Sequence, residues 1–396
     1  MSVTTASTPE TAAPAVPAHH AWRRAFGLRE AGVYYALVLL ILVLTAATAL
    51  TGRPSYLSPV NLTNILYQSS LIAIMGVAMT VILITGNFDL SVASVAALAA
   101  AVMISVCGAI GFWPAVVVAL AVAAAVGLLN GAIVQFLGIN AFIVTLGTLT
   151  AIRGLVLIVT DGRSLAVDDP GVLAQMTSFE SGRFGLRPLL LVAGVALLLS
   201  LLPRLRRGGA GQVLRVPAIA FAGAGGIVCL LLGALAGSRL SVALPVVYML
   251  GFTLVCWAVL GFTTIGRRVY AVGGNAEAAR LSGINVDAYK LGGFILSAVA
   301  AGFAGVLFGC RFGAINPTGL QGAELTVIAS AILGGTSLLG GAGSVVKTVV
   351  GSLLLFTLNN GFNILNLGAN YQGVIEGTVV VAAAAIYTVG SRRRGR

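Results

Sequence analysis

Long apolar segments follow one another along almost the entire chain, and they restrict its fold more than any other feature. A helix needs about 20 mostly apolar residues to cross a lipid bilayer. The sequence therefore predicts an all-α integral membrane protein, a polytopic helical bundle of about ten to twelve transmembrane helices. Several segments are short or interrupted by glycine, which is compatible with a broken or re-entrant span. The candidate spans are 31–52, 63–85, 89–110, 114–136, 141–160, 188–202, 217–237, 241–262, 291–309, 325–338, 345–366 and 373–390.

The composition excludes a soluble globular domain. Charged residues make up 9% of the chain and hydrophobic residues 58%, whereas soluble domains carry about 25% charged residues. The 51 glycines suit closely packed membrane helices, because small side chains let two backbones approach each other. We expect a single membrane domain at 31–390, with tails at 1–30 and 391–396.

The basic residues predict the orientation in the membrane. A formal net charge of +12 would suggest nucleic acid as the partner of a soluble protein. Here, sixteen of the 23 Lys and Arg residues fall on the side of the N-terminus, six fall on the other side, and one lies within a span. Cytoplasmic loops of membrane proteins are enriched in Lys and Arg. We therefore expect both termini in the cytoplasm and no nucleic-acid partner.

Reactive groups that could form an active site are scarce. Both histidines, His19 and His20, lie in the N-terminal tail, and the four cysteines are scattered without a CxxC pair. The segment 343–348 comes nearest to a phosphate-binding loop but lacks the glycine before its lysine. We predict no catalytic residue, no metal site and no cofactor, so that an ATP-driven role would require a separate subunit.

Asp89 lies between two apolar spans, in the segment Gly86–Ser91. A carboxylate at the centre of a bilayer costs about 2.5–3.5 kcal/mol on insertion scales. One interpretation is that Asp89 caps the helix that follows it. The other is that it contacts the transported species, as part of a pathway that includes Asn87 and Ser91. A charge pair between Asp89 and Arg153, which lies within a span, is a further hypothesis.

Two sets of neutral polar residues lie within the spans. Thr145 and Thr148 share one side of the segment 141–160 with Arg153, where they could form hydrogen bonds between helices or face a pathway. An asparagine stripe recurs at steps of four, three and four residues, which places it on one helical face. It is expected to line a pathway or to contact another helix, and such groups suit a polyhydroxylated solute such as a sugar. The stripe consists of Asn359, Asn363, Asn366 and Asn370.

One polar, charged segment interrupts the apolar chain at 266–290. It contains Glu277, Ala278, Ala279 and Arg280 in a short helix-forming stretch, which Gly283 ends. Spacing alone does not distinguish an ordinary basic linker from a helix that binds a cytoplasmic partner.

Four sequence blocks together resemble the monosaccharide-type permeases of ATP-binding cassette (ABC) importers, the family of the ribose, xylose and arabinose systems. The loop at 263–290 is similar to the EAA coupling motif of ABC permeases, with Glu277, Ala278, Ala279 and Gly283 at the motif positions. The first block departs from the usual G-G-I-D-L-S-V-G pattern at three positions. The three departing residues are Asn87, Phe88 and Ala93. The four blocks are Gly86–Val92, Phe142–Thr148, Gly273–Ile284 and Leu333–Gly341.

This resemblance implies a type II ABC importer-like permease of a bacterial inner membrane, surrounded by lipid. It implies a homodimer that binds two cytoplasmic ATPase subunits through the coupling loop and receives sugar from an extracytoplasmic binding protein. The long stretch 188–262 resembles the extended xylose-type permeases, so xylose is the first expected substrate. The implied coupling residues are Glu277, Ala278, Ala279, Arg280 and Gly283, and the implied substrate pathway comprises Asn87, Asp89, Ser91, Thr145, Thr148, Asn359 and Asn363.

Two alternatives remain open. One is an ABC permease for branched-chain amino acids, nucleosides or another monosaccharide. The other is an ion-coupled secondary transporter, for which Asp89, Arg153 and Glu376 are the candidate titratable groups within the membrane.

Overall fold

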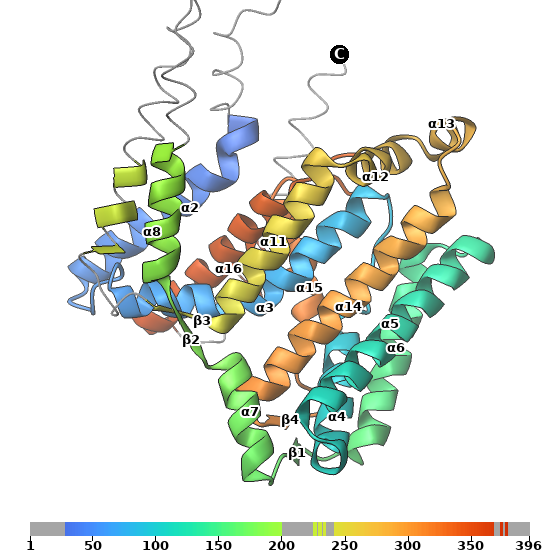
Figure 1. The fold of residues 1–396 in the computed structure, drawn as a ribbon, viewed down its shortest axis with the longest axis horizontal. Helices are drawn as coiled ribbons and strands as arrows, with labels where there is room; N and C mark the ends of the chain where they lie inside the picture. The colour runs from blue at the N-terminus through green and yellow to red at the C-terminus, as the bar shows by residue number, and fades with distance from the viewer. Residues whose placement is uncertain are drawn as a thin grey trace, which may run out of the picture.

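The computed structural model describes residues 28–199 and 241–367, with short pieces at 225–227, 229–231, 233–234, 373–374 and 377–378. Helices dominate this part of the chain (Figure 1). The helices are α2 (Leu28–Leu50), α3 (Pro59–Ile84), α4 (Val92–Ile110), α5 (Phe112–Phe136), α6 (Ala141–Thr160), α7 (Pro170–Glu180), α8 (Leu186–Leu199), α11 (Leu244–Phe262), α12 (Thr264–Gly274), α13 (Ala276–Leu281), α14 (Val286–Phe312), α15 (Ala323–Leu333) and α16 (Val345–Leu365). The strands are β1 (Leu165–Ala166), β2 (Arg183–Gly185), β3 (Ser241–Ala243) and β4 (Ala314–Ile315).

Eight helices of the described part are long and apolar enough to cross a membrane. They are α2, α3, α4, α5, α6, α11, α14 and α16, and each corresponds to a predicted span with boundaries shifted by a few residues. The all-α polytopic fold is thus confirmed. The predicted span 188–202 corresponds to α8. Most of 217–237, of 373–390 and of both tails lies outside the described residues.

The predicted span 325–338 is wrong as a full-length transmembrane helix. Helix α15 has only 11 residues, which is about 16 Å of helix. It ends at a pair of glycines, of which Gly335 adopts a positive φ of 80°, and irregular backbone continues to the start of α16. Irregular backbone at membrane depth must be buried in protein, because lipid offers it no hydrogen-bond partner. Accordingly, α15 packs against α3 and α16.

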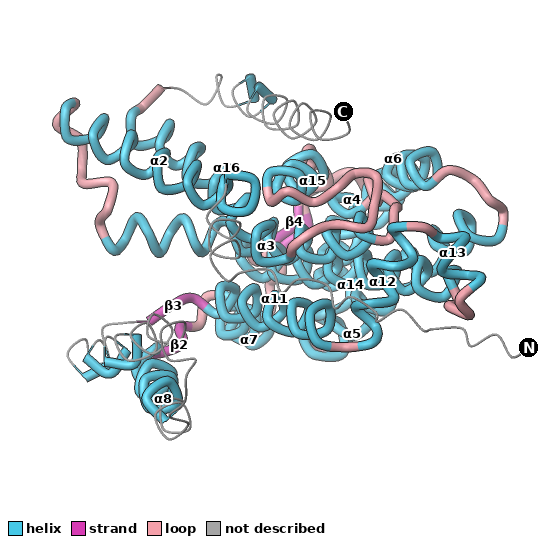
Figure 2. Tube along the Cα trace, turned by 90° about the horizontal axis from the view of Figure 1, so that it is seen from above, coloured by secondary structure: helices cyan, strands magenta, loops and turns pink. Residues whose placement is uncertain are grey.

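Helix α3 is the central helix of the bundle. Its residues from Ser69 to Ile84 are all buried, as expected for a helix that is apolar on every side. It packs against α11, α14, α15 and α16. Helices α2 and α6, by contrast, expose many large apolar side chains, and Figure 2 shows α2 at one side of the bundle, beyond α16. These outer faces are suited to lipid or to another subunit.

Glycines bring α14 into backbone contact with its neighbours. A Cβ atom added to Gly305 would lie 1.9 Å from the carbonyl oxygen of Ala96 on α4. A Cβ atom at Gly127 of α5 would lie 2.6 Å from the Cβ of Ala298 on α14. This close approach explains the high glycine content, because any larger residue at these positions would push the helices apart.

The bundle has two distinct ends. Helices α12 and α13 lie at one end, and α7 with the β1–β4 pair lies at the opposite end (Figure 1). We call these the α13 end and the α7 end. Strand β1 pairs antiparallel with β4, with Leu165 opposite Ile315. Strand β2 pairs antiparallel with β3, with Phe184 opposite Val242.

Candidate functional site

The predicted coupling loop folds as the two helices α12 and α13. Asn275 separates them and caps α13, because its Oδ1 accepts a hydrogen bond from the backbone N–H of Ala278 at 3.0 Å. Glu277 lies in the first turn of α13 and Arg280 in its last turn. Both charges are favourably placed relative to the helix dipole.

Helix α13 ends in a Schellman motif at Gly283, which confirms the predicted glycine stop. Gly283 has a φ of 79°, its N–H donates to the carbonyl of Arg280 at 3.0 Å, and the N–H of Ile284 donates to the carbonyl of Ala279 at 3.0 Å. A left-handed residue at this position favours glycine. The short helix is therefore fixed at both ends by local sequence.

Exposure divides the five predicted coupling residues into two groups. Ala279 is buried and packs with Val272 and Val286 in a small apolar cluster that joins α13 to α12 and α14. The other four, Glu277, Ala278, Arg280 and Gly283, are exposed. Leu281, which was not expected from the sequence, is 85% exposed on the same helix. The surface of α13 thus combines charges with one large apolar side chain.

Asp89 is completely buried at the start of α4. Its Oδ1 accepts a hydrogen bond from the backbone N–H of Ser91 at 3.0 Å and another from the Ser91 hydroxyl. Its Oδ2 accepts a hydrogen bond from the hydroxyl of Ser297 on α14 at 2.7 Å. Asp89 thus forms a local turn with Ser91, two residues further on. The N-cap residue of α4 is Ser91, so the prediction that Asp89 itself caps this helix is wrong.

The Asp89 network continues onto two more helices, α5 and α6. The Ser91 hydroxyl accepts a hydrogen bond from the side-chain amide of Asn130 on α5 at 3.1 Å. The Asn130 carbonyl oxygen accepts one from the hydroxyl of Thr148 on α6 at 2.7 Å. Asn130 and Ser297 were not predicted, although each is an isolated polar residue in an apolar stretch, which is the signal that would have identified them.

Two other predicted pathway residues, Thr145 and Asn87, form local hydrogen bonds. The Thr145 hydroxyl donates within its own helix to the carbonyl of Ala141 at 2.8 Å. Asn87 is nearly buried, and its amide donates to the Thr85 hydroxyl at 3.4 Å. Asn359 and Asn363 belong to α16, which packs against α2, α3, α11 and α15.

The asparagine stripe lies on α16 only in part. Asn366 ends that helix in a left-handed conformation with a φ of 57°, and Asn370 lies outside the described residues. The neighbouring Asn360 donates to the side chain of Asn61 on α3 at 2.8 Å. Amides of α16 therefore make at least one contact between helices.

The hypothesis of an Arg153–Asp89 charge pair is wrong. Arg153 pairs with Glu324 of α15, with 3.4 Å between Nη2 and Oε2. Thr148 marks the level of the Asp89 network on α6, and Arg153 lies five residues further along that helix. Five residues correspond to about 7.5 Å of helix rise, which places the guanidinium at a different depth.

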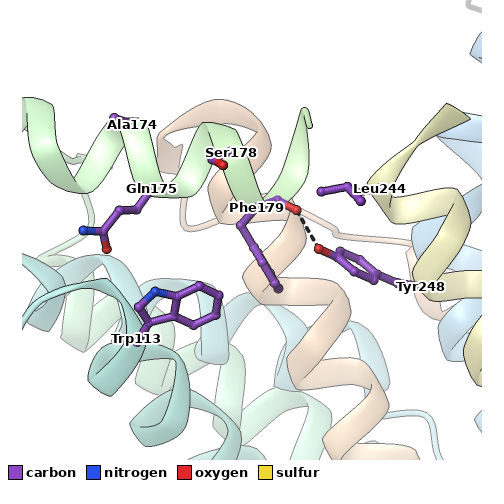
Figure 3. A pocket seen from close by; sticks show the side chains of 7 residues that line it. All are labelled: Trp113, Ala174, Gln175, Ser178, Phe179, Leu244 and Tyr248. Atoms are coloured by element: carbon purple, nitrogen blue, oxygen red, sulfur yellow. Dashed lines mark hydrogen bonds between the residues drawn. The ribbon is translucent and has the colours of Figure 1, made fainter. Parts of the chain in front are cut away.

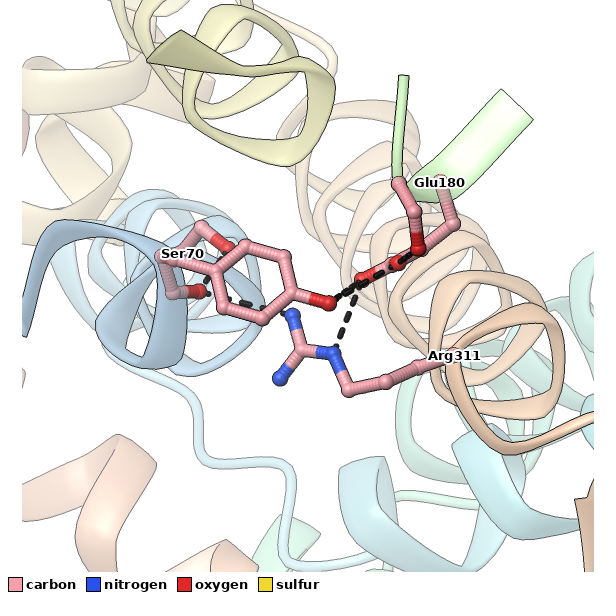
Figure 4. Close-up of polar contacts among 5 residues, drawn as sticks. Ser70, Glu180 and Arg311 are labelled. Carbon is pink, nitrogen blue, oxygen red and sulfur yellow. Dashed lines mark hydrogen bonds and ion pairs between the residues drawn. The ribbon is translucent and has the colours of Figure 1, made fainter. Parts of the chain in front are cut away.

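A buried ion pair at the α7 end was missed by the sequence reasoning. Glu180 of α7 is completely buried, and its Oε1 accepts hydrogen bonds from Arg311 Nε at 2.8 Å and from the Tyr67 hydroxyl at 2.6 Å (Figure 4). The guanidinium of Arg311 also lies 3.9 Å from the centroid of the Tyr67 ring. The cluster joins α3, α7 and α14. Nothing in the sequence spacing of Glu180 and Arg311 indicated that they pair.

A pocket of about 480 Å³ also opens at the α7 end, between α5, α7 and α11 (Figure 3). The rings of Trp113 and Phe179 meet edge to face with 5.4 Å between centroids, and the Tyr248 hydroxyl donates to the carbonyl of Phe179 at 3.0 Å. The lining residues are Trp113, Ala174, Gln175, Ser178, Phe179, Leu244 and Tyr248.

Comparison with known proteins assigns the family. Residues 61–384 match the family described as "Branched-chain amino acid transport system / permease component", which is most of the chain. The chain belongs to this permease family. Like its relatives, the permease is a transporter subunit and not an enzyme, in agreement with the resemblance seen in the four blocks.

Three Escherichia coli K12 proteins are similar to the permease over nearly its whole length. The ribose import permease protein RbsC is 34% identical over 349 residues, which cover 88% of this chain and 92% of the relative. The xylose transport system permease protein XylH is 31% identical over 373 residues, covering 91% and 92%. The D-allose transport system permease protein AlsC is 30% identical over 354 residues, covering 89% and 90%. No solved structure shows a significant match.

Proposed function

We propose that this permease imports a monosaccharide and that a separate cytoplasmic ATPase drives the transport. Relatives named for ribose, xylose and allose support the class of substrate. The neutral amides and hydroxyls within the bundle also suit a sugar. The bacterial inner membrane, with both termini in the cytoplasm and lipid around α2 and α6, is the environment that this proposal requires.

The exposed helix α13 is the observation that carries the proposal. It is short and capped at both ends, and the buried side chain of Ala279 packs it against α12 and α14. Its outer face presents Glu277, Arg280 and Leu281, which we assign to the ATPase interface together with Ala278 and Gly283. The membrane domain at 31–390 contributes one coupling loop, at 263–290, so that two copies of the chain would serve two ATPase subunits as a homodimer.

The pathway is proposed to lie beside the Asp89 network. Asp89, Ser91 and Thr148 tie α4, α5, α6 and α14 together, so that solute can reach Asp89 only when these helices separate. Asn87, Thr145, Asn359 and Asn363 are retained as further candidates for the lining. An extracytoplasmic sugar-binding protein would deliver the solute to the α7 end.

The identity of the sugar belongs to the proposal as well. A xylose-like pentose was expected, yet the ribose permease is more identical to this chain than the xylose permease, at 34% against 31%. The family description names branched-chain amino acids, so a branched-chain amino acid is the alternative substrate. Uptake of labelled ribose, xylose, allose and leucine into cells that express the complete transport system would separate these substrates.

The ATPase interface can be tested at Leu281. Replacing Leu281 by Ala removes an apolar contact and should lower the affinity for the ATPase about tenfold, measured by co-purification and by binding in detergent. Leu57→Ala is the matched control, because Leu57 is 48% exposed and lies in the α2–α3 connection, away from α13. Equal binding by both variants would contradict the assignment. Uptake that needs no ATPase and collapses with the proton gradient would favour a secondary transporter instead.

A further inference from the structure

Three of the four sequence blocks meet at one backbone junction at the α13 end. The first block follows Ile84, the last residue of α3, the third begins at Gly273 in α12, and the fourth ends at Gly341 in the loop between α15 and α16. The N–H of Gly341 donates to the carbonyl of Ile84 at 2.9 Å. The end of α3 is thus bonded directly to the α15–α16 loop.

The junction has no space for a side chain at Gly273. A Cβ atom there would lie 1.6 Å from the carbonyl oxygen of Ile84 and 2.8 Å from the nitrogen of Gly341. A Cβ atom at Gly340 would lie 2.7 Å from the carbonyl oxygen of Gly273 and 3.0 Å from the Cα of Gly86. The backbone of α12 therefore rests directly on the end of α3 and on the α15–α16 loop.

Tyr270 adds a side-chain contact to the same loop. Its hydroxyl donates to the carbonyl of Gly343 at 3.0 Å. Burial raises the pKa of Tyr270, so that the phenol keeps its proton and remains a donor at physiological pH. Helix α12 is thus attached to the α15–α16 loop one turn away from Gly273.

From the junction, covalent and hydrogen bonds lead into the bundle. Ile84 is separated by four residues from Asp89, whose carboxylate binds Ser91 and Ser297. The second block, Phe142–Thr148, joins through Thr148, which reaches Ser91 by way of Asn130. All four blocks are therefore linked, although they are far apart in the sequence.

We propose that this junction transmits the movement of the coupling loop to α3 and to the α15–α16 loop, and that Gly273 and Gly341 are positioning residues for transport. Contacts between backbones cannot be relieved by a change of rotamer, whereas a contact through a long side chain can. When the ATPase moves α13, the end of α3 and the α15–α16 loop move with it. The inference rests on the proposed function, because it requires an ATPase that moves α13.

Two neighbouring glycines provide a matched test. Gly273→Ala introduces a methyl group into the junction, whereas Gly274→Ala introduces the same group where no heavy atom lies within 4 Å. Each permease is reconstituted with its ATPase and binding protein, and uptake of labelled ribose, xylose and allose is measured per ATP hydrolysed. We expect Gly273→Ala to bind the ATPase and hydrolyse ATP while uptake per ATP falls about tenfold. Gly274→Ala should match the wild type.

Tyr270→Phe keeps the inference testable if Gly273→Ala fails to insert. This variant removes one hydrogen bond across the junction and preserves the ring, so uptake per ATP should fall about two- to tenfold. Unchanged uptake per ATP in every variant that inserts would overturn the inference, as would losses that only follow a loss of ATPase binding. Failure of the wild-type permease to bind an ATPase would instead overturn the proposed function, and that result is obtained before any variant is compared.

Discussion

At the scale of single residues, the two buried carboxylates of the described part, Glu180 and Asp89, are stabilised in different ways. Glu180 faces the guanidinium of Arg311 and the Tyr67 hydroxyl. Asp89 is satisfied by hydroxyls and a backbone amide, from Ser91 and Ser297. A buried charge without such partners would be very costly, so the removal of a partner should have a large effect.

Replacing Arg311 by Met should destabilise the permease strongly, because Glu180 would remain buried without its cation. Breaking one side of a buried ion pair costs about 3–5 kcal/mol, which should appear as a lower thermal unfolding midpoint in detergent. The double variant Arg311→Met/Glu180→Gln should recover much of the loss. Arg163→Met is the control, since Arg163 and Asp161 form a pair with 82% and 86% exposed side chains. An equal shift for Arg311→Met and Arg163→Met would contradict the structural role of the buried pair.

At the scale of elements, α13 shows how a short polar helix is maintained beside a membrane. Six residues would not form a stable helix alone. The Asn275 cap, the Schellman motif at Gly283 and the apolar contact of Ala279 together fix it. A rigid α13 is what an ATPase would need in order to move the bundle.

Gly283→Ala should loosen α13 without preventing membrane insertion. Alanine in the left-handed region costs about 1–2 kcal/mol, so hydrogen exchange at the Ile284 amide should accelerate about five- to thirtyfold. ATPase binding should weaken in parallel. Gly292→Ala in α14 is the control, because no heavy atom lies within 4 Å of the added methyl group and that glycine is helical. Unchanged exchange in Gly283→Ala would show that the left-handed residue is not needed to hold α13.

At the scale of the whole molecule, the two ends of the bundle differ in chemistry. The α13 end carries the exposed polar helix and the glycine junction, whereas the α7 end carries the buried ion pair and the aromatic pocket. This asymmetry matches a permease that binds a cytoplasmic ATPase at one end and receives solute from a binding protein at the other. The predicted orientation places the α13 end in the cytoplasm.

Labelling with a membrane-impermeant maleimide can test that orientation. In a Cys229→Ser background, the substitution Gln175→Cys should be labelled in intact spheroplasts. The substitution Leu281→Cys should be labelled only after the membrane is permeabilised. Both positions are exposed. Labelling of the Cys229→Ser variant without either substitution measures the contribution of the remaining native cysteines. The reverse labelling pattern would show that the basic residues mark the opposite side.

Local features of the chain were predictable. Eight spans, the polar coupling segment and its glycine stop follow from runs of apolar residues and from the backbone preference of Gly283. These properties depend on neighbours within a few turns. The segment 325–338 was counted among the spans, and the sequence showed that some spans are short or interrupted by glycine. It did not show that α15 would end after 11 residues.

The amino-acid sequence by itself determined that this protein is a bundle of membrane helices with one exposed charged loop, since hydrophobicity and capping act over short distances. Only the tertiary structure decided which buried groups meet. Asp89 finds Ser297 across 208 residues and Arg153 finds Glu324 across 171, and the backbones of Gly273 and Ile84 touch. Such contacts depend on which helices pack together and at what relative height, and no local pattern contains that information.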